Sequence, residues 1–338
     1  MNKLFSFSKL IRLPNLLIIA LAQYAMRWGV IYPMYEFINR QLIHNFPDKI
    51  TNPRIMKFQV SEFQFFLLSL ATVMIAAAGY IINDYFDVKI DRINKPGQMV
   101  IDNGIKRREA MLAHLVISGI AIALAFFVSY RLELWHYSLI YAACAAGLWF
   151  YSTEFKKQFL TGNVMIALFV ALTPFIVGLY ELHLTVIKYR VLTLPPFEVN
   201  FKVMFDFIMG FSALAFLINL IREIIKDISD MEGDREFGCR TLPITLGIET
   251  SKNIISVLIV LLMFVIGYIQ EGQFDSSAKI SFTYLLLFVQ LPLALLIYLV
   301  QKARTPVEFK TPDLLSKLVM LTGVLYTLVI YYSFMHHA

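Results

Sequence analysis

The sequence predicts an all-α, polytopic membrane protein built as a bundle of nine transmembrane helices. Of its 338 residues, 58% are hydrophobic and 16% are charged, and the mean hydropathy is +0.66. A soluble domain has a smaller apolar share and a larger charged share. Nine apolar stretches are long enough to cross a bilayer, and the basic residues between them are unevenly distributed. Together these observations indicate a chain that lies largely inside a membrane.

The nine spans follow from the length that a helix needs to cross the hydrocarbon, about 20 residues. They are expected at Leu13–Tyr32, Glu62–Ile82, Met111–Tyr130, Leu134–Tyr151, Leu160–Glu181, Val203–Ile221, Ile254–Gln270, Phe282–Val300 and Leu314–Ser333. Short connections such as Arg131–Glu133 predict neighbouring antiparallel helices. No low-complexity linker divides the chain, so we expect residues 1–338 to form one domain.

The basic residues predict the orientation of the bundle. With a cytoplasmic N-terminus, 20 of the 30 lysines and arginines fall on the cytoplasmic side, where multi-pass proteins concentrate them. The net charge of +6 is therefore an orientation signal, and nothing suggests a nucleic-acid partner. Cys144 lies in an apolar span and Cys239 in a cytoplasmic loop, so no disulfide is expected.

Several peripheral features have structural interpretations. Arg27, near the outer end of the first span, is expected to snorkel toward the interface. Residues 35–57 and 184–202 mix polar and aromatic side chains, which is typical of interfacial loops or surface helices. His114 has no partner at metal-ligand spacing, so a structural role is expected.

Two acidic segments carry the functional signal. They read "IINDYFDVKIDR" at Ile81–Arg92 and "IIKDISDMEGDR" at Ile224–Arg235. The first contains Asp84, Asp87 and Asp91, and the second contains Asp227, Asp230 and Asp234. We call these triplets the first and second aspartate sets. Positions i, i+3 and i+7 of a helix fall within an arc of about 60°, so each set can face one point on the cytoplasmic side.

Carboxylates grouped at a membrane boundary repel one another and require a cation among them. Oxygen ligands without nearby histidine or cysteine favour Mg²⁺ over zinc, and Asn83 adds a neutral oxygen. One Mg²⁺ takes only one or two carboxylates and completes its shell with water and phosphate. Six aspartates therefore suit two or more ions bridged by a polyphosphate.

Basic residues accompany both sets and are natural partners for phosphate oxygens. They are Arg92 and Lys95 after the first set, and Arg222 and Lys226 at the second. Arg12, in "RLPN", marks the cytoplasmic end of the first helix and can also reach a phosphate. Such a mouth on an apolar bundle would accept a diphosphate with an oily tail, which would lie between the helices.

Three other classes of protein remain as alternatives. A cation-coupled transporter also buries aspartates, but near the middle of the membrane and usually on broken helices. A CDP-alcohol phosphotransferase uses several aspartates with Mg²⁺, but groups them in one continuous segment. A scaffold protein has no reason to keep six aligned carboxylates.

These residues resemble the UbiA-type intramembrane prenyltransferases. "NDYFDVKIDRINKP", Asn83–Pro96, is similar to their NDxxDxxxD signature, and "DISDMEGD", Asp227–Asp234, to their DxxDxxxD signature. "RLPN", "YST" with Lys156, "GN" at Gly162-Asn163 and "GCRTLPITLG" at Gly238–Gly247 also resemble family positions. The resemblance implies a nine-helix bundle with a central cavity capped on the cytoplasmic side, and Mg²⁺-dependent transfer of a polyprenyl group from its diphosphate to a lipophilic acceptor.

The resemblance also implies roles for individual residues. The expected metal ligands are Asn83, Asp84, Asp87, Asp91, Asp227, Asp230 and Asp234. The expected diphosphate-binding residues are Arg12, Asn15, Arg92, Lys95, Lys156, Arg222 and Lys226. The expected catalytic residues are Asp84, Asp87 and Asp230, with Tyr151 near the reacting carbon.

The acceptor is expected from the second acidic segment. "REIIKDISDMEGD", Arg222–Asp234, followed by "TLPITLG", most resembles the branch that prenylates a glyceryl phosphate ether. This resemblance implies a geranylgeranyl diphosphate donor and a geranylgeranylglyceryl phosphate-type acceptor. The alternative acceptor is an aromatic quinone precursor of the homogentisate or 4-hydroxybenzoate type.

Overall fold

The computed structural model describes residues 3–49, 55–94, 97, 99–271 and 279–336, and across these ranges the regular structure is helical. Short helices are α1 (Lys3–Leu10), α9 (Met231–Glu236) and α10 (Leu242–Leu246). Long helices are α4 (Glu62–Asn94), α5 (Arg107–Arg131), α6 (Ser138–Thr153), α7 (Thr161–Lys188), α8 (Lys202–Ser229), α11 (Ile248–Glu271) and α14 (Lys310–His336). Two spans contain a π-helical turn: α2 (Leu13–Ala25), η1 (Met26–Ile31) and α3 (Tyr32–Asn45), and then α12 (Lys279–Leu285), η5 (Leu286–Gln290) and α13 (Leu291–Lys302). Single 3₁₀ turns are η2 (Trp135–Tyr137), η3 (Phe155–Lys157), η4 (Arg190–Thr193) and η6 (Pro306–Phe309).

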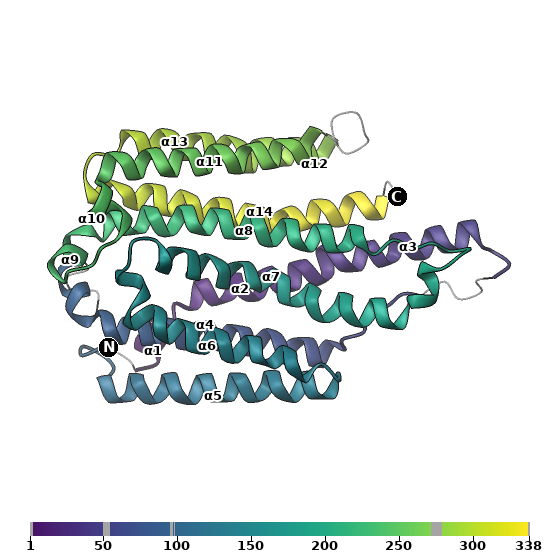
Figure 1. Ribbon diagram of the computed structural model, residues 1–338, viewed down its shortest axis with the longest axis horizontal. Helices are drawn as coiled ribbons and strands as arrows, with labels where there is room; N and C mark the ends of the chain where they lie inside the picture. Colours follow the sequence, from purple (N-terminus) through teal and green to yellow (C-terminus); the bar gives the residue numbers. More distant parts are fainter. Residues whose placement is uncertain (1–2, 50–54, 95–96, 98, 272–278, 337–338) are drawn as a thin grey trace.

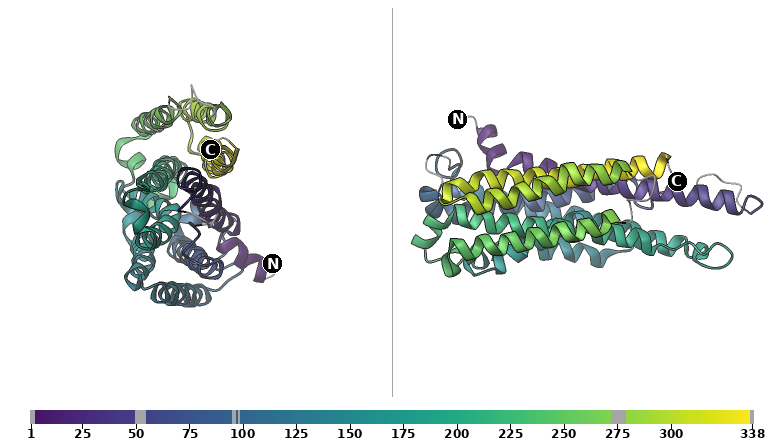
Figure 2. Two further views of the ribbon diagram at one scale, coloured as in Figure 1. Left: turned by 90° about the vertical axis from the view of Figure 1, so that its right-hand side faces the viewer. Right: turned by 90° about the horizontal axis from the view of Figure 1, so that it is seen from above.

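The long helices run side by side along the longest axis of the molecule (Figures 1 and 2). In the described chain, eight of them are long and apolar enough to span a membrane. The ninth, α6, has 16 residues and packs against α4 and α5 in the same bundle. α1 lies near the same end as α9 and α10, whereas α14 finishes toward the opposite end (Figure 1). A chain that begins at one end of the bundle and finishes at the other must cross it an odd number of times. The structure therefore agrees with the nine predicted spans. We call the end with α9 and α10 the capped end and the other the far end.

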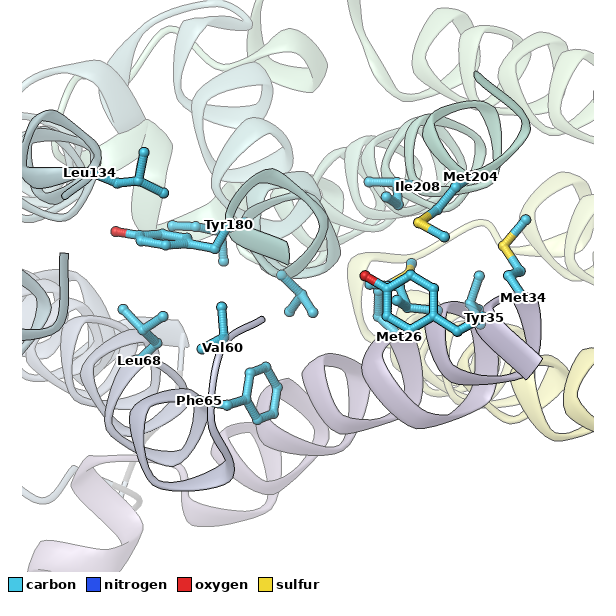
Figure 3. Packing of buried hydrophobic residues seen from close by; sticks show 14 of the residues in the cluster. Met26, Met34, Tyr35, Val60, Phe65, Leu68, Leu134, Tyr180, Met204 and Ile208 are labelled. Atoms are coloured by element: carbon cyan, nitrogen blue, oxygen red, sulfur yellow. The ribbon is translucent and has the colours of Figure 1, made fainter. Parts of the chain in front are cut away.

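The first span is longer than the sequence analysis expected. It continues through η1 into α3 and ends at Asn45 rather than Tyr32. Tyr35 and Leu42, which belong to a segment interpreted as interfacial, are buried. Figure 3 shows Met26, Met34 and Tyr35 of this span opposite Met204 and Ile208 of α8. Polar Arg40, Gln41 and His44 lie on the other, exposed side of α3, whereas Asn39 is buried and bonds the backbone of Met56. Composition alone therefore concealed a core-forming helix.

Close packing at this level requires a glycine. A Cβ on Gly178 of α7 would collide with the side chain of Ile208 on α8. The absence of a side chain lets the two helices approach closely, which is a common device for packing helices in membranes. The structure also bears out two smaller expectations. Cys144 and Cys239 are free thiols, and His114 is buried with its Nδ1 2.9 Å from the carbonyl oxygen of Ala78.

Arg27 does not snorkel; that expectation is wrong. Its side chain is 1% exposed and donates hydrogen bonds to Glu181 (3.2 Å), Glu62 (2.8 Å) and the carbonyl of Val60 (2.7 Å). The guanidinium also lies over the rings of Phe58 and Phe65, at 3.8 and 4.5 Å from their centroids. A buried charge is tolerated when a counterion and hydrogen bonds surround it. This arrangement joins the first span, the start of α4 and the C-terminal third of α7.

Removing one partner of this buried pair should destabilise the bundle. For Arg27→Met we expect the free energy of unfolding to fall by about 3–5 kcal/mol, because Glu181 would be left buried without a counterion. Thermal unfolding in detergent provides the measurement. The double variant Arg27→Met/Glu181→Met should recover most of the loss, since apolar side chains of similar volume can replace a buried pair. A double variant less stable than the single one would contradict this account.

Candidate functional site

A cavity opens between α2, α4, α6, α7 and α8; the empty volume, including the solvent space at its opening, is about 1140 Å³. Its polar lining lies toward the capped ends of these helices: Arg12, Asn15, Tyr80, Asn83, Tyr151, Asn219, Arg222, Glu223 and Lys226. Its deeper lining is mostly apolar and includes Ile19, Ile75, Ile140, Leu148, Phe169, Val170 and Ile176. The cavity therefore suits a molecule with a charged head and a hydrocarbon tail.

The first aspartate set lies entirely on α4, as the helical spacing predicted. Its carboxylates are half-buried rather than directed into open solvent. Arg12 donates a hydrogen bond to Asp84 at 2.8 Å, and Lys156 pairs with Asp87. Arg12 has a left-handed backbone (φ 51°) between α1 and α2, and Pro14 follows near the start of α2. This uncommon conformation for a non-glycine residue accompanies a guanidinium that reaches α4.

The second aspartate set differs from its expected geometry. α8 ends at Ser229, Asp230 lies at the junction (φ −98°, ψ 4°), and Asp234 belongs to α9. The three carboxylates therefore do not form a stripe on one continuous helix, as the spacing had suggested. Asn163 of α7 donates a hydrogen bond to Asp227 at 2.8 Å. A break at Asp230 directs the short helix α9 back toward α4.

Asn94, the last residue of α4, joins the two acidic segments. Its side-chain amide donates to the carbonyl of Asp230 at 2.9 Å, and its side-chain oxygen accepts from the backbone N–H of Gly233 at 2.8 Å. A Cβ on Gly233 would lie 2.6 Å from the Asn94 side chain. Glycine is thus required for this close approach. Although 143 positions separate Asp84 from Asp227, the two aspartate sets meet at one end of the cavity.

The proximity of the sets affects the ionisation of Asp234. Partial burial, together with the carboxylates of Asp230 and Asp87, raises the pKa of Asp234 to about 7. Neighbouring negative charges disfavour an ionised carboxylate, and a cation between them would reverse the effect. Within the described ranges, no three acidic, histidine or cysteine side chains surround one point closely enough to form a complete metal site. The donors fit Mg²⁺, which takes few carboxylates and shares its shell with phosphate oxygens and water.

Most of the expected basic residues lie at the same end of the bundle. Arg12, Arg222 and Lys226 line the cavity, and Lys156 reaches Asp87 beside it. Arg92 is not brought there: it is 63% exposed and lies 4.0 Å from Asp102 in the neighbouring loop. Lys95 lies outside the described residues.

Tyr151, near the end of α6, lines the cavity between the two sets. It lies within electrostatic range of Asp87 and Asp227. Across the cavity, Asn15 donates to the hydroxyl of Tyr80 at 3.4 Å, and the Arg12 guanidinium lies 4.8 Å from the centroid of the Tyr80 ring. Aromatic faces thus flank the cationic end of the cavity.

Sequence reasoning missed four residues that shape this end. Asn219 and Glu223 line the cavity one helical turn apart on α8, and Glu223 contacts both Arg222 (2.9 Å) and Lys226 (3.6 Å). Asn219, Glu223 and Asp227 follow one another at intervals of four residues, and positions i and i+4 share a helix face. This spacing could have identified the first two from the sequence. Asn94 and Asp313 had no such signal. Asp313, on α14, lies 3.1 Å from Arg222 and is far from it in sequence.

The fold and the cavity define an all-helical membrane protein with matched acidic segments over the polar end of an apolar cavity. The model of the UbiA prenyltransferase family matches residues 57–334, and the chain belongs to this family. The resemblance on the two signatures is thereby confirmed, and the protein is a prenyltransferase-family enzyme.

Individual relatives give the same assignment. The chain is 33% identical over 249 residues to a digeranylgeranylglyceryl phosphate synthase from Saccharolobus solfataricus, which covers 72% of this chain and 78% of that protein. A protein of the same name from Thermococcus sibiricus is 32% identical over 190 residues, 56% of this chain and 58% of its own length. A solved UbiA homologue from Archaeoglobus fulgidus, bound to GPP and Mg²⁺, superimposes with a TM-score of 0.55 at 15% identity, covering 95% and 99% of the two chains. That structural likeness supports the fold.

Separating the two acidic segments should weaken the site. In Gly233→Ala, the added methyl group would displace Asn94, and in Asn94→Ala both of its hydrogen bonds would be lost. We expect each change to lower the free energy of unfolding by about 1–3 kcal/mol. We also expect it to reduce the rise in melting temperature produced by Mg²⁺ with inorganic diphosphate.

Gly210→Ala on α8 is the matched control for this experiment. Apart from its chain neighbours and its own helix backbone, no atom of the described residues lies within 4 Å of the added methyl group, and alanine favours a helix over glycine. This variant should retain the full response to Mg²⁺ and diphosphate. The same response in Gly233→Ala and Asn94→Ala would show that the contact between α4 and α9 does not position the site.

Proposed function

We propose that this protein transfers a prenyl group, best a geranylgeranyl group, from its diphosphate to a lipophilic acceptor. The observation on which the proposal depends is the meeting of the two aspartate sets at the polar end of an otherwise apolar cavity. Under this proposal the diphosphate lies between the sets and the prenyl chain lies among the deeper apolar residues. The GPP and Mg²⁺ bound to the Archaeoglobus fulgidus homologue support a prenyl diphosphate as the ligand.

The metal-binding residues under this proposal are Asn83 with the first and second aspartate sets. Mg²⁺ bound there would neutralise charge on the diphosphate. The pKa of Asp234 is raised to about 7, so near neutral pH both of its forms are populated without a metal ion. A cation beside it would favour the ionised form. Asn94 and Gly233 keep the two groups of ligands close together. Lys156 and Asn163 orient Asp87 and Asp227 respectively.

Departure of the diphosphate requires that its growing negative charge be stabilised. Arg12, Arg222 and Lys226 face the cavity and can donate hydrogen bonds to phosphate oxygens. Arg92 receives no such support, because the structure places it beside Asp102. The rings of Tyr151 and Phe169 line the cavity and can stabilise an allylic cation. The surrounding apolar side chains exclude the water that would otherwise capture this cation.

The proposed acceptor is a geranylgeranylglyceryl phosphate-type ether lipid. Support comes from the Saccharolobus solfataricus relative, a digeranylgeranylglyceryl phosphate synthase that aligns with 72% of this chain. The test is incubation of the purified protein with Mg²⁺, geranylgeranyl diphosphate and separate acceptors, including homogentisate and 4-hydroxybenzoate. Prenylated ether lipid with released diphosphate is the expected result. Reaction with only an aromatic acceptor would overturn the proposed acceptor, and the absence of product with every acceptor would overturn the function.

Loss of one carboxylate from either set should abolish transfer. For Asp87→Ala and Asp230→Ala we expect turnover to fall by at least about 100-fold, because metal-bound charge stabilisation is lost. Product formation by chromatography is the measurement, with melting temperature as a test of folding. Asp206→Ala is the control: this aspartate is exposed near the start of α8 and pairs only with Lys202 among the described partners. Near-normal turnover in both site variants would contradict the metal role.

We further propose that the capped end faces the cytoplasm. The distribution of lysines and arginines supports this orientation. In intact cells, a membrane-impermeant thiol reagent should label Lys57→Cys, whose side chain is exposed at the far end, and should not label Glu236→Cys on α9. The native thiols provide little background because Cys239 is buried and Cys144 lies within the bundle. The reverse labelling pattern would invert the proposed orientation.

A further inference from the structure

One polar group of the cavity has no partner in the structure. Asn219 is 2% exposed, and its side-chain Nδ2 finds no hydrogen-bond acceptor in the part of the chain that the structure describes. Buried amide donors in native proteins are almost always satisfied, because leaving one unpaired lowers stability. Asn219 lines the cavity, so an acceptor atom of a molecule bound there can supply the missing partner.

A second polar group lies one turn away and is unexpected in a diphosphate site. Glu223 is 5% exposed, belongs to neither aspartate set and lines the same cavity. It is held by Arg222 at 2.9 Å and Lys226 at 3.6 Å. A carboxylate that faces the cavity would repel a diphosphate, although it also offsets the charges of the two basic residues. An ionised carboxylate only accepts hydrogen bonds, so it complements a molecule that donates one.

Together the two side chains match a single hydroxyl group. The amide of Asn219 donates and the carboxylate of Glu223 accepts, whereas a hydroxyl both accepts and donates. Residues four apart on a helix place their Cβ atoms about 5–6 Å from each other, a distance that one oxygen can bridge. A phenolic hydroxyl can make the same two bonds, but an aromatic acceptor reacts at a ring carbon, which neither donates nor accepts them. A benzoate carboxylate would also be repelled by Glu223.

We propose that Asn219 and Glu223 form the acceptor subsite and bind the nucleophilic hydroxyl of an aliphatic alcohol. This inference rests on the proposed prenyl transfer and specifies its acceptor class and the residues that recognise it. Their place on α8, beside Lys226 and Asp227, puts the hydroxyl next to the diphosphate end of the donor. Tyr151, within electrostatic range of Glu223, Lys226 and Asp227, marks the adjoining side of the cavity.

The step balances with these groups. The bond between C1 of the prenyl chain and the diphosphate oxygen breaks, and its electron pair leaves with the diphosphate. A lone pair of the hydroxyl oxygen forms the new carbon–oxygen bond at C1. The electron pair of the O–H bond stays on that oxygen, and the proton passes to the Glu223 carboxylate. The products are an ether, diphosphate and protonated Glu223, which returns its proton to water.

Asn219→Leu tests the amide with a side chain of similar size. We expect the KM for geranylgeranylglyceryl phosphate to rise about 2- to 10-fold, as for a lost hydrogen bond, while the KM for geranylgeranyl diphosphate is unaltered. The melting temperature should stay the same or rise, because an unpaired buried donor has been removed. Ser118→Ala is the matched control, since Ser118 on α5 is also buried and unpaired among the described residues but does not line the cavity. It should change neither KM.

Glu223→Gln tests the carboxylate while conserving its size. General-base residues typically contribute about 10²- to 10⁴-fold, and we expect kcat for transfer to fall within that range. Diphosphate release from the donor without acceptor should fall by a much smaller factor. Glu223→Asp should recover part of the transfer. A residue that only neutralised Arg222 and Lys226 would affect both reactions equally.

The outcomes separate this subsite from the proposed function. If the wild-type protein prenylates no acceptor, or only an aromatic one, both the proposed ether-lipid synthesis and the subsite are overturned. If the wild-type protein forms the ether but Asn219→Leu leaves the acceptor KM unchanged, the subsite alone is overturned. The same conclusion follows if Glu223→Gln reduces donor-only diphosphate release as strongly as transfer.

Discussion

Repulsion among the two aspartate sets is the constraint on which the capped end of the bundle depends. Six half-buried carboxylates meet where α4 approaches α9, and burial, together with the neighbouring carboxylates of Asp230 and Asp87, raises the pKa of Asp234. Arg12 and Lys156 offset part of this charge. The neutral side chain of Asn94 hydrogen-bonds to the backbone of Asp230 and Gly233, so it holds the two acidic segments together without adding a charge. Grouping these carboxylates lowers stability unless a cation binds among them. The charge that is unfavourable by itself therefore makes the site suitable for binding a metal ion.

The cavity extends this charged end into the membrane. α8 contributes the polar side chains of Asn219, Glu223 and Lys226 to the cavity lining, whereas the deeper apolar lining comes from α2, α4, α6 and α7. The far end is joined by a different polar cluster, centred on Arg27 and Glu181, which is buried and internally paired. Charge at one end therefore faces a cavity, whereas charge at the other end holds helices together. Full burial and mutual pairing therefore distinguish the charged residues that join helices from those that line the cavity.

The sequence predicted most of the fold because hydropathy and span length report directly on membrane crossing. The nine spans and the α4 placement of Asp84, Asp87 and Asp91 were predictable from apolar periods and helical spacing. The break of α8 at Ser229 was not, because no glycine or proline occurs there to signal it. Arg27 was misjudged because its partner Glu181 is 154 positions away. Long-range partners of this kind, including Asp313, are invisible to any local pattern.

The break between α8 and α9 gives the two halves of the site unequal stiffness. The first aspartate set is fixed along one unbroken helix, so its oxygen spacings are those of an α-helix. The second set straddles a joint at Asp230, where a small change in backbone torsion would move Asp234 relative to Asp227. The relative positions of the first-set carboxylates therefore follow from one helix, whereas those of the second set also depend on the torsions at Asp230 and on the two Asn94 hydrogen bonds. A ligand of different size would be accommodated more readily by the second set than by the first.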